Sequence, residues 1–376
     1  MNTKKTKRSI LNKRLKVFVG MSGGVDSSVA ALLLQKQGHE VVGCFIKGWY
    51  PAGFYCSWRE DRRDAMRVCA RLKIPFITID AEKEYKKEVV DYMVSEFKAG
   101  RTPNPDVMCN KYIKFGVFLK KALGMGADFI ATGHYVKIKK SDKGLRKEHF
   151  SLFQAYDLNK DQSYFLWALT QQQLRHCLFP LGGMLKPEVK KIARASGLIT
   201  ADKKESMGVC FIGEFNINEF LKKYIKPKKG KIITIAGEVI GEHEGVQFYT
   251  IGQRHGFSSA SLRSTELRCG ESGVPYYIVA KDIKKNIIIV ADKSREEKYY
   301  KKEVELRSVN WLAGSAPDTK KIYQARIRYR QPLQSCRIKG GKTYKVVFTK
   351  PQRAVTAGQS IVVYDKQNML GGGIIV

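Results

Sequence analysis

The segment VFVGMSGGVDSS, residues 17–28, joins an apolar strand to an apolar helix through a loop of glycine, hydroxyl and acidic residues. Two adjacent glycines, residues 23–24, carry no side chain where the backbone must turn sharply and approach a ligand. The hydroxyl groups of Ser22, Ser27 and Ser28 add donors beside the helix N-terminus, where backbone amides and the helix dipole favour an anion. The segment therefore predicts a phosphate site at a strand-to-helix junction.

The loop indicates which phosphate is used. A Walker loop, GxxxxGK[ST], has a lysine after its second glycine, whereas Val25 follows Gly24 here. We therefore expect chemistry at the α-phosphate instead of γ-phosphate transfer. SGGVDSS resembles the pyrophosphate loop (PP-loop) of the ATP pyrophosphatases, which adenylate an oxygen atom of their substrate and release pyrophosphate. An ordinary glycine-serine turn of an α/β fold is the alternative.

After this loop, apolar segments alternate with helical patterns, which is typical of a doubly wound, mostly parallel sheet. Ligands bind such sheets at the carboxyl ends of the strands, where the serine-glycine loop and Thr132–His134 both fall. We expect a charged, glycine-containing hairpin tip at 137–147. Strands are predicted at 41–46, 76–80 and 127–134, and helices at 29–37, 59–72, 82–97, 111–123, 165–169 and 187–198.

The pattern changes after Cys210 to a short helix at 218–224 and then to strands. Strands at 231–235, 238–240, 276–280 and 287–290 predict a small β-rich central domain, and 304–376 reads as a closed β-barrel. We expect four parts: a basic N-terminal arm at 1–15, a PP-loop domain of the adenine nucleotide α-hydrolase type at 16–215, the central domain at 216–295, and the barrel at 296–376.

Composition narrows the class of protein. The 376 residues contain 68 Lys and Arg against 35 Asp and Glu, a net charge of +33 that favours a polyanionic partner: RNA, DNA or an anionic membrane. No apolar run reaches membrane-spanning length. None of the eight cysteines forms a CxxC pair, so we expect neither a disulfide framework nor a permanent metal or iron-sulfur cluster. We expect a cytoplasmic protein.

Two cysteines lie in unusual surroundings. Cys109 ends RTPNPDVMC, whose two prolines predict an extended loop before a helix that begins at Lys111. A helix N-terminus favours the thiolate, and Asp106 could act as an acid or base. Cys210 follows two lysines, which also favour the thiolate. A buried structural cysteine is the alternative in each case.

Several motifs occur together and in order: TPNPDVMCN, TGHY, KDQSYFLW, GVCFIG, GKIITIAGEVIGEHEG, YTIGQRHG, RIRYRQ and AVTAGQS. From Val17 to its end the chain is similar to the tRNA-specific 2-thiouridylase family. The resemblance implies an enzyme that adenylates C2 of the wobble uridine (position 34) with ATP. Persulfide sulfur then replaces the oxygen, which gives 2-thiouridine, AMP and pyrophosphate. In the family, the adenylating domain, the central domain and the barrel together hold the anticodon arm.

The resemblance also assigns residues. Cys109 would be the nucleophile, Cys210 the persulfide carrier and Asp106 an acid or base; the two cysteines would end as a transient disulfide. The implied ATP-binding residues are Gly20, Met21, Ser22, Gly23, Gly24, Val25, Asp26, Ser27, Ile46 and Gly133. The implied tRNA-binding residues are Asn104, Pro105, Asp106, His134, Lys160, Asp161, Gln162, Arg328, Tyr329 and Gln359.

The implied partners are ATP with transient Mg²⁺, the tRNAs for Glu, Gln and Lys, and a persulfide donor, either a cysteine desulfurase or a sulfur-relay protein. We expect a monomer. The chain departs from the family pattern at Ile46, where methionine is usual, at Glu205, and at Ala357, where proline is expected. The rival classes are another PP-loop synthetase, a cytidine thiolase with an iron-sulfur cluster, and a non-catalytic RNA-binding protein.

Overall fold

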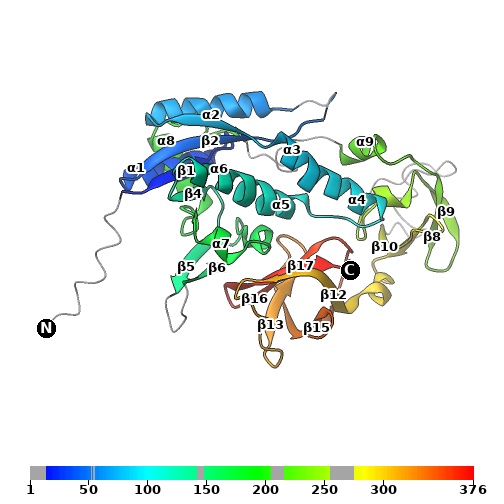
Figure 1. Cartoon of the computed structure of the whole chain (residues 1–376). Helices are drawn as coiled ribbons and strands as arrows, with labels where there is room; N and C mark the ends of the chain where they lie inside the picture. The colour runs from blue at the N-terminus through cyan, green and yellow to red at the C-terminus, as the bar shows by residue number, and fades with distance from the viewer. Residues whose placement is uncertain (1–13, 52, 54–55, 142–147, 205–215, 255–274) are drawn as a thin grey trace. The chain divides into compact units, whose positions relative to one another are not determined.

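The structure is a computed structural model that describes residues 14–51, 53, 56–141, 148–204, 216–254 and 275–376 (Figure 1). The chain divides into two compact units. The first consists of Met1–Val89, Asp106–Glu214 and Gln367–Met369, and the second of Val90–Pro105, Phe215–Lys366 and Leu370–Val376. Within the described ranges, every helix is too short or too polar to span a bilayer.

A five-stranded parallel sheet forms the centre of the first unit, in the order β3-β2-β1-β4-β7. The chain moves outward from β1 in both directions, so the strand order reverses between β1 and β4 and places a ligand crevice there. Gly20, at the end of β1, is in register with Cys44 and Thr132. The strands are β1 Lys16–Gly20, β2 Glu40–Lys47, β3 Phe76–Asp80, β4 Phe129–Thr132 and β7 Cys177–Leu178.

Helices cover both faces of this sheet (Figure 1), which confirms the expected doubly wound α/β fold. On one face, Val17, Val19 and Phe45 lie in one buried core with helices α1 Val25–Lys36, α2 Trp58–Leu72 and α8 Lys186–Ala195. On the other face, Phe118 packs against the position of Gly20.

Helix α1 begins four residues earlier than predicted, at Val25 instead of Val29. Gly24 is its extended N-cap, and the hydroxyl groups of Ser27 and Ser28 donate to the Gly24 carbonyl oxygen at 3.1 and 2.8 Å. Asp26 then lies in the first turn, where a carboxylate is favoured by the helix dipole. The phosphate-loop residues are therefore partly helical.

The extended loop predicted up to Asn110 is wrong beyond Asn104. A continuous helical segment starts at Pro105 and comprises α5 Pro105–Met108, the π-helix η2 Cys109–Val117 and α6 Phe118–Gly124. Proline is tolerated in the first turn of a helix because its missing amide would have no helical partner there. Cys109 accordingly lies in the second helical turn.

The other differences are small. The predicted helix at 165–169 is a 3₁₀ turn, η3 Ser163–Leu166, and the short α7 Gln171–Leu174 was not predicted. Residues 137–141, predicted as part of a hairpin tip, form strand β5 Lys137–Ser141, which pairs with β6 His149–Phe153. Strand β6 also pairs with Asn368 and Met369. The helical stretch predicted at 82–97 comprises α3 Glu82–Tyr85, the π-helix η1 Lys86–Asp91 and α4 Tyr92–Lys98.

The second unit contains a four-stranded sheet and a barrel. The sheet has the order β10-β11-β8-β9, and the six antiparallel barrel strands run β12-β15-β14-β13-β16-β17, closed by pairing of β12 with β17. Alternate residues such as Val346 and Phe348 point into the barrel core. The elements are α9 Ile217–Lys222, β8 Gly230–Thr234, β9 Val239–His243, β10 Tyr276–Asp282, β11 Ile287–Asp292, β12 Lys301–Trp311, β13 Tyr323–Arg326, β14 Gln334–Lys339, β15 Tyr344–Gln352, β16 Ser360–Asp365 and β17 Asn368–Ile375, with short 3₁₀ turns η4 Val246–Phe248 and η5 Glu296–Tyr299.

Candidate functional site

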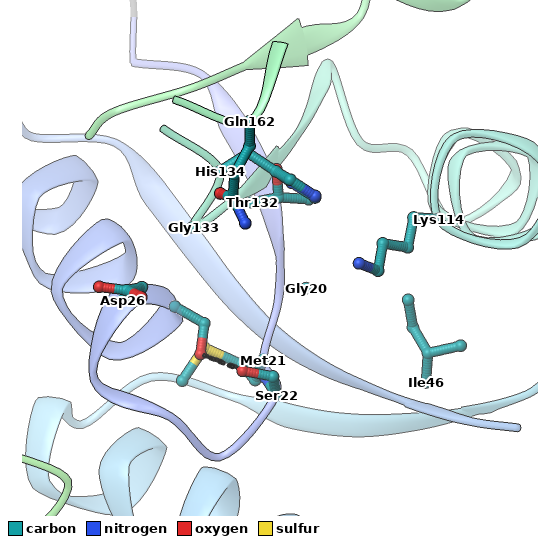
Figure 2. Close-up of a pocket in the computed structure, with 11 residues that line it drawn as sticks. Gly20, Met21, Ser22, Asp26, Ile46, Lys114, Thr132, Gly133, His134 and Gln162 are labelled. Atoms are coloured by element: carbon teal, nitrogen blue, oxygen red, sulfur yellow. Dashed lines mark hydrogen bonds between the residues drawn. The ribbon is translucent and has the colours of Figure 1, made fainter. Parts of the chain in front are cut away.

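A pocket lies at the carboxyl ends of β1, β2 and β4, where the crevice between β1 and β4 is expected (Figure 2). It contains seven of the ten predicted ATP-binding residues and two of the predicted tRNA-binding residues. Thr132, expected at this strand end, also lines it, as does Lys114, which sequence reasoning missed. The residues that line it are Gly20, Met21, Ser22, Asp26, Ser27, Ile46, Lys114, Thr132, Gly133, His134 and Gln162.

Serine hydroxyl groups close the glycine-rich loop on itself. Besides the bonds to the Gly24 carbonyl, the Ser27 hydroxyl accepts from the Ser22 amide at 3.1 Å. The Ser28 hydroxyl accepts from Thr200 at 3.0 Å and is fully buried, so it supports the loop instead of facing the pocket. Gly23 has φ +73°, and a Cβ there would lie 2.3 Å from the carbonyl oxygen of Asp61. Only glycine fits this turn.

Asp26 is held by two side chains of the same unit. The Lys186 ammonium donates to both carboxylate oxygens of Asp26 at 2.6 and 2.8 Å, and the Tyr135 hydroxyl donates to one of them at 2.8 Å. The Lys186 side chain is 8% exposed and that of Asp26 is 33% exposed. A mostly buried ammonium therefore fixes the carboxylate at the edge of the pocket.

Gly133 lines the pocket beside the first turn of α1. A Cβ at this position would lie 2.7 Å from the Ser27 amide nitrogen and 2.8 Å from the carbonyl carbon of Asp26. The turn after β4 and the first turn of α1 thus approach more closely than any side chain allows. This contact explains why glycine occupies the position between Thr132 and His134.

His134 is buried, and its Nδ1 lies 2.8 Å from the Thr132 hydroxyl. Burial and, to a smaller extent, the positive charge of Lys114 hold the pKa of His134 well below its ordinary value. The ring is therefore neutral near pH 7 and packs against Phe115 and Phe179. Gln162 accepts from the Tyr135 amide at 3.0 Å, which fixes its side chain at the same pocket.

The neighbouring predicted tRNA contact, Asp161, has a carboxylate that is turned inward. It is 1% exposed and accepts from Gln154, the Ala155 amide and Ser163. Asp161 therefore stabilises the turn that carries Gln162, while Lys160 is half-buried.

The structure describes one of the two candidate cysteines. Cys109 is fully buried within η2, and Asp106, one helical turn before it, is half-buried. Cys210 lies outside the described residues, so the meeting of the two thiols stays a prediction.

Lys203, one of the two lysines before Cys210, is paired with Asp61 at 2.8 Å and Asp64 at 2.6 Å. Two carboxylates thus compensate its charge, and its effect on the Cys210 thiol stays a prediction.

In the second unit, residues 101–103 are held by the loop between β15 and β16. The Gln359 amide donates to the carbonyl oxygens of Thr102 at 2.9 Å and Pro103 at 3.0 Å, and the Thr102 amide donates to Ala357 at 2.9 Å. Gly358, with φ +91°, lies so close that a Cβ would be 2.8 Å from the Thr102 carbonyl oxygen. The predicted base-contacting residue Asn104 directly follows this anchored segment.

Glu96 anchors the start of the same loop. Its side chain is 6% exposed, and it accepts two hydrogen bonds from Arg101, at 2.8 and 2.7 Å, and one from Arg307 of β12 at 2.6 Å. Burial raises the pKa of the Glu96 carboxyl, but the hydrogen bonds and charges of the two arginines outweigh it, so the pKa lies below its ordinary value. The ion-paired cluster therefore carries a permanent carboxylate.

Arg328 and Tyr329, predicted to contact tRNA, are half-buried. One terminal nitrogen of the Arg328 guanidinium donates to the Ile251 carbonyl at 2.6 Å, the Thr356 hydroxyl at 3.0 Å and the Ala354 carbonyl at 3.3 Å. The guanidinium of Arg330 lies 5.2 Å from the Tyr329 ring centroid. Arg328 thus joins its own loop to the loops that contain Ile251 and residues 354–356.

A glycine-serine loop between a central parallel strand and a helix, with its pocket at the strand ends, defines a PP-loop nucleotide-binding domain. Family models match the chain as a tRNA methyl transferase HUP domain at residues 15–214, a PRC-barrel domain at 218–292 and an aminomethyltransferase β-barrel domain at 301–375.

Curated relatives cover nearly the whole chain and are called tRNA-specific 2-thiouridylases. The MnmA protein of Streptococcus thermophilus (strain CNRZ 1066) is 44% identical over 97% of this chain and 96% of its own length. MnmA 2 of Geobacillus kaustophilus (strain HTA426) is 45% identical over 96% of this chain and 94% of its own. The chain belongs to the tRNA-specific 2-thiouridylase family, as its motifs indicated.

Replacing Lys186 by methionine should lower the free energy of unfolding by about 1–3 kcal/mol, because Asp26 would keep a partly buried charge without its ammonium partner. Urea unfolding measures the change. The matched control is Arg194→Met, which breaks an ion pair with Asp202 whose side chains are 62% and 74% exposed. That change should stay within about 0.5 kcal/mol. If both substitutions lowered the free energy of unfolding equally, the buried Lys186–Asp26 pair would contribute no more to stability than an exposed pair.

Gly133→Ala should weaken ATP binding by about tenfold or more, because the new methyl group forces the turn after β4 and the first turn of α1 apart. Titration with ATP under equilibrium conditions measures the affinity. Gly183→Ala is the control, since a Cβ there meets nothing within 4 Å. An unchanged ATP affinity of the Gly133 variant would show that ATP binding does not require close contact between the turn after β4 and the first turn of α1.

Gln359→Leu should speed hydrogen exchange in residues 101–104, because the two carbonyl oxygens lose their shared donor and the loop opens more often. Exchange followed by mass spectrometry measures the rate. Gln334→Leu serves as the control, since that side chain donates to a single nearby carbonyl, of Pro332. Identical exchange in wild type and the Gln359 variant would refute the anchoring role.

Proposed function

We propose that this protein is an ATP-dependent tRNA sulfurtransferase that converts the wobble uridine, position 34, to 2-thiouridine. The observation that carries the proposal is the convergence of the SGGVDS loop, Ile46 and Gly133 on one pocket, in a chain whose family is that of the 2-thiouridylases. Direct exchange of a carbonyl oxygen for sulfur is unfavourable because oxide is a poor leaving group. Adenylation solves this problem by turning the oxygen into part of AMP.

ATP fits the pocket with its phosphates toward the first turn of α1. Backbone amides there bind an anion, and the dipole of the 12-residue helix adds positive potential. Buried Ile46, at the end of β2, offers an apolar surface to the adenine. Asp26 supplies oxygens of the hard type that Mg²⁺ takes in addition to phosphate and water oxygens, so the lining is compatible with the magnesium expected to accompany ATP.

The reaction balances in two stages. The C2 oxygen of uridine attacks the α-phosphorus, and pyrophosphate leaves with the electrons of the broken P–O bond. The terminal sulfur of the Cys210 persulfide then attacks C2 and AMP leaves. The Cys109 thiolate attacks Sγ of Cys210, so the old S–S electron pair passes to the sulfur on C2 and a Cys109–Cys210 disulfide forms. A cellular thiol reductant restores the two thiols.

The target base must leave its stack, because a stacked uridine hides its C2 carbonyl. We propose that Asn104, Pro105 and Asp106 contact the extruded base, with Asp106 as acid or base. The further proposed tRNA contacts are His134, Lys160, Asp161, Gln162, Arg328, Tyr329 and Gln359. The net charge of +33 supports binding to an RNA backbone.

The domain division is proposed as 1–15, 16–215, 216–295 and 296–376, and the residues matched by the three family models support it. The proposed partners are the tRNAs for Glu, Gln and Lys and a persulfide donor, either a cysteine desulfurase or a relay protein. A monomer in the cytoplasm is consistent with acting on tRNA. Neither a resident metal nor a cluster is required by the scheme.

The direct test incubates the protein with ATP, Mg²⁺, a persulfide source and unmodified tRNA, followed by nucleoside mass spectrometry. We expect the wobble uridine to gain the mass difference between sulfur and oxygen. Cys109→Ser and Cys210→Ser should abolish the gain, whereas Cys56→Ser, which changes a half-buried cysteine outside the scheme, should not. Unmodified tRNA together with continued pyrophosphate release would show that adenylation is correct and the sulfur chemistry is not.

Cys210→Ser should still release pyrophosphate in the presence of tRNA, because activation of C2 precedes the use of sulfur. The variant should form adenylated tRNA without 2-thiouridine, and a coupled pyrophosphate assay measures the first stage. If pyrophosphate release disappears with the thiol, the order of the two stages is wrong.

A further inference from the structure

Lys114 places a positive charge in the wall of the nucleotide pocket. It belongs to the π-helix η2, five residues after Cys109 at the start of that helix. Figure 2 shows its side chain extending from the helix toward the space between Gly20 and Ile46. π-helical turns are rare and occur frequently at functional sites. The wall formed by η2 faces the glycine-rich loop across the pocket.

The charged residues of the pocket lining favour an anion there. Its neighbours Ile113 and Phe115 are buried in the first unit, and Lys114 itself is half-buried. Asp26, the carboxylate of the pocket lining, is balanced by Lys186 at 2.6 and 2.8 Å. His134 is neutral because burial, assisted by the charge of Lys114, depresses its pKa. The described lining together with Lys186 therefore has a net positive charge.

The proposed reaction creates the anion that this charge suits. When the uridine oxygen attacks, negative charge grows on the non-bridging oxygens of the α-phosphorus, and it remains on the AMP that later leaves. A fixed cation in a pocket that excludes water stabilises such charge more than bulk water does. A lysine is a compact point charge that suits a phosphate oxygen. The loop amides bind phosphate from the side of α1, and Lys114 approaches from the side of η2.

We propose that Lys114 binds a non-bridging oxygen of the ATP α-phosphate and acts as a catalytic residue of adenylation and of AMP departure. This role rests on the proposed function, since it specifies which described side chain stabilises the reacting phosphate. It differs from a structural role, in which Lys114 would only support the pocket wall and keep His134 neutral.

The test measures tRNA-dependent pyrophosphate release without a sulfur donor, so that only adenylation is observed. Lys114→Met keeps the length of the side chain and removes its charge, and the rate constant at saturating ATP and tRNA should fall about 100- to 1,000-fold. Lys114→Arg should recover part of the loss. The control is Lys120→Met, which removes an exposed lysine from the adjoining α6 and should keep the wild-type rate.

Binding measurements separate catalysis from folding. Lys114→Met should bind tRNA with unchanged affinity and unfold at the wild-type temperature. Ethylammonium added to Lys114→Ala should restore part of the rate, which lost packing alone would not allow.

The proposed catalytic role of Lys114 would be overturned if Lys114→Met kept the wild-type rate of pyrophosphate release. It would also be overturned if weaker tRNA binding fully explained the loss of rate. A wild-type protein that releases no pyrophosphate with tRNA would instead overturn the proposed function, and the role of Lys114 with it.

Discussion

The ion pair between Asp26 and Lys186 is the interaction on which the nucleotide site depends. It joins the first turn of α1 to the first residue of α8, and Tyr135 adds the segment after β4. Three pieces of chain that are distant in sequence thereby meet at one carboxylate. Since the Lys186 side chain is 8% exposed, its buried charge in turn depends on the partly exposed carboxylate of Asp26. The loop that would hold phosphate is thus held in place by groups of the protein itself.

Close packing of backbone also holds this loop in place. Gly23 lies against the backbone of Asp61, and Gly133 lies against Ser27. At each point a single Cβ would enter space that another backbone occupies. Glycine is therefore needed at these two positions chiefly because another segment of backbone lies too close for a side chain. A preorganised site of this kind avoids the cost of ordering its donors when charge develops on the phosphate.

The second unit uses its barrel to hold a loop that precedes the helix of Cys109. Gln359 and Glu96 fix residues 101–103 from two sides, by hydrogen bonds to carbonyl oxygens and by ion pairs with Arg101 and Arg307. The barrel therefore has a structural role toward this loop. It orders the residues that directly precede Asn104, which the family resemblance places at the target base.

Much of the architecture followed from the sequence, because strand periodicity, the glycine-rich loop and the two shifts in pattern are local signals. The order of motifs identified the family, and the rule that ligands bind at strand ends brought Ser22 and Gly133 to one site. The start of the helix at Pro105 was missed, because a proline in the first turn and a proline in a loop look alike in sequence. Lys114 was missed because one lysine among 68 basic residues has no distinguishing local pattern.

By itself, the sequence determined the family, the α/β fold, the PP-loop and the two candidate cysteines, since each is written in neighbouring residues. Only the tertiary structure decided which charges meet. Asp26 with Lys186, Gln359 with the Thr102 carbonyl, and Lys114 with the nucleotide pocket join residues of different elements. Such pairings arise from how helices and strands pack, and the separation of the partners along the chain hides them from any reading of local sequence.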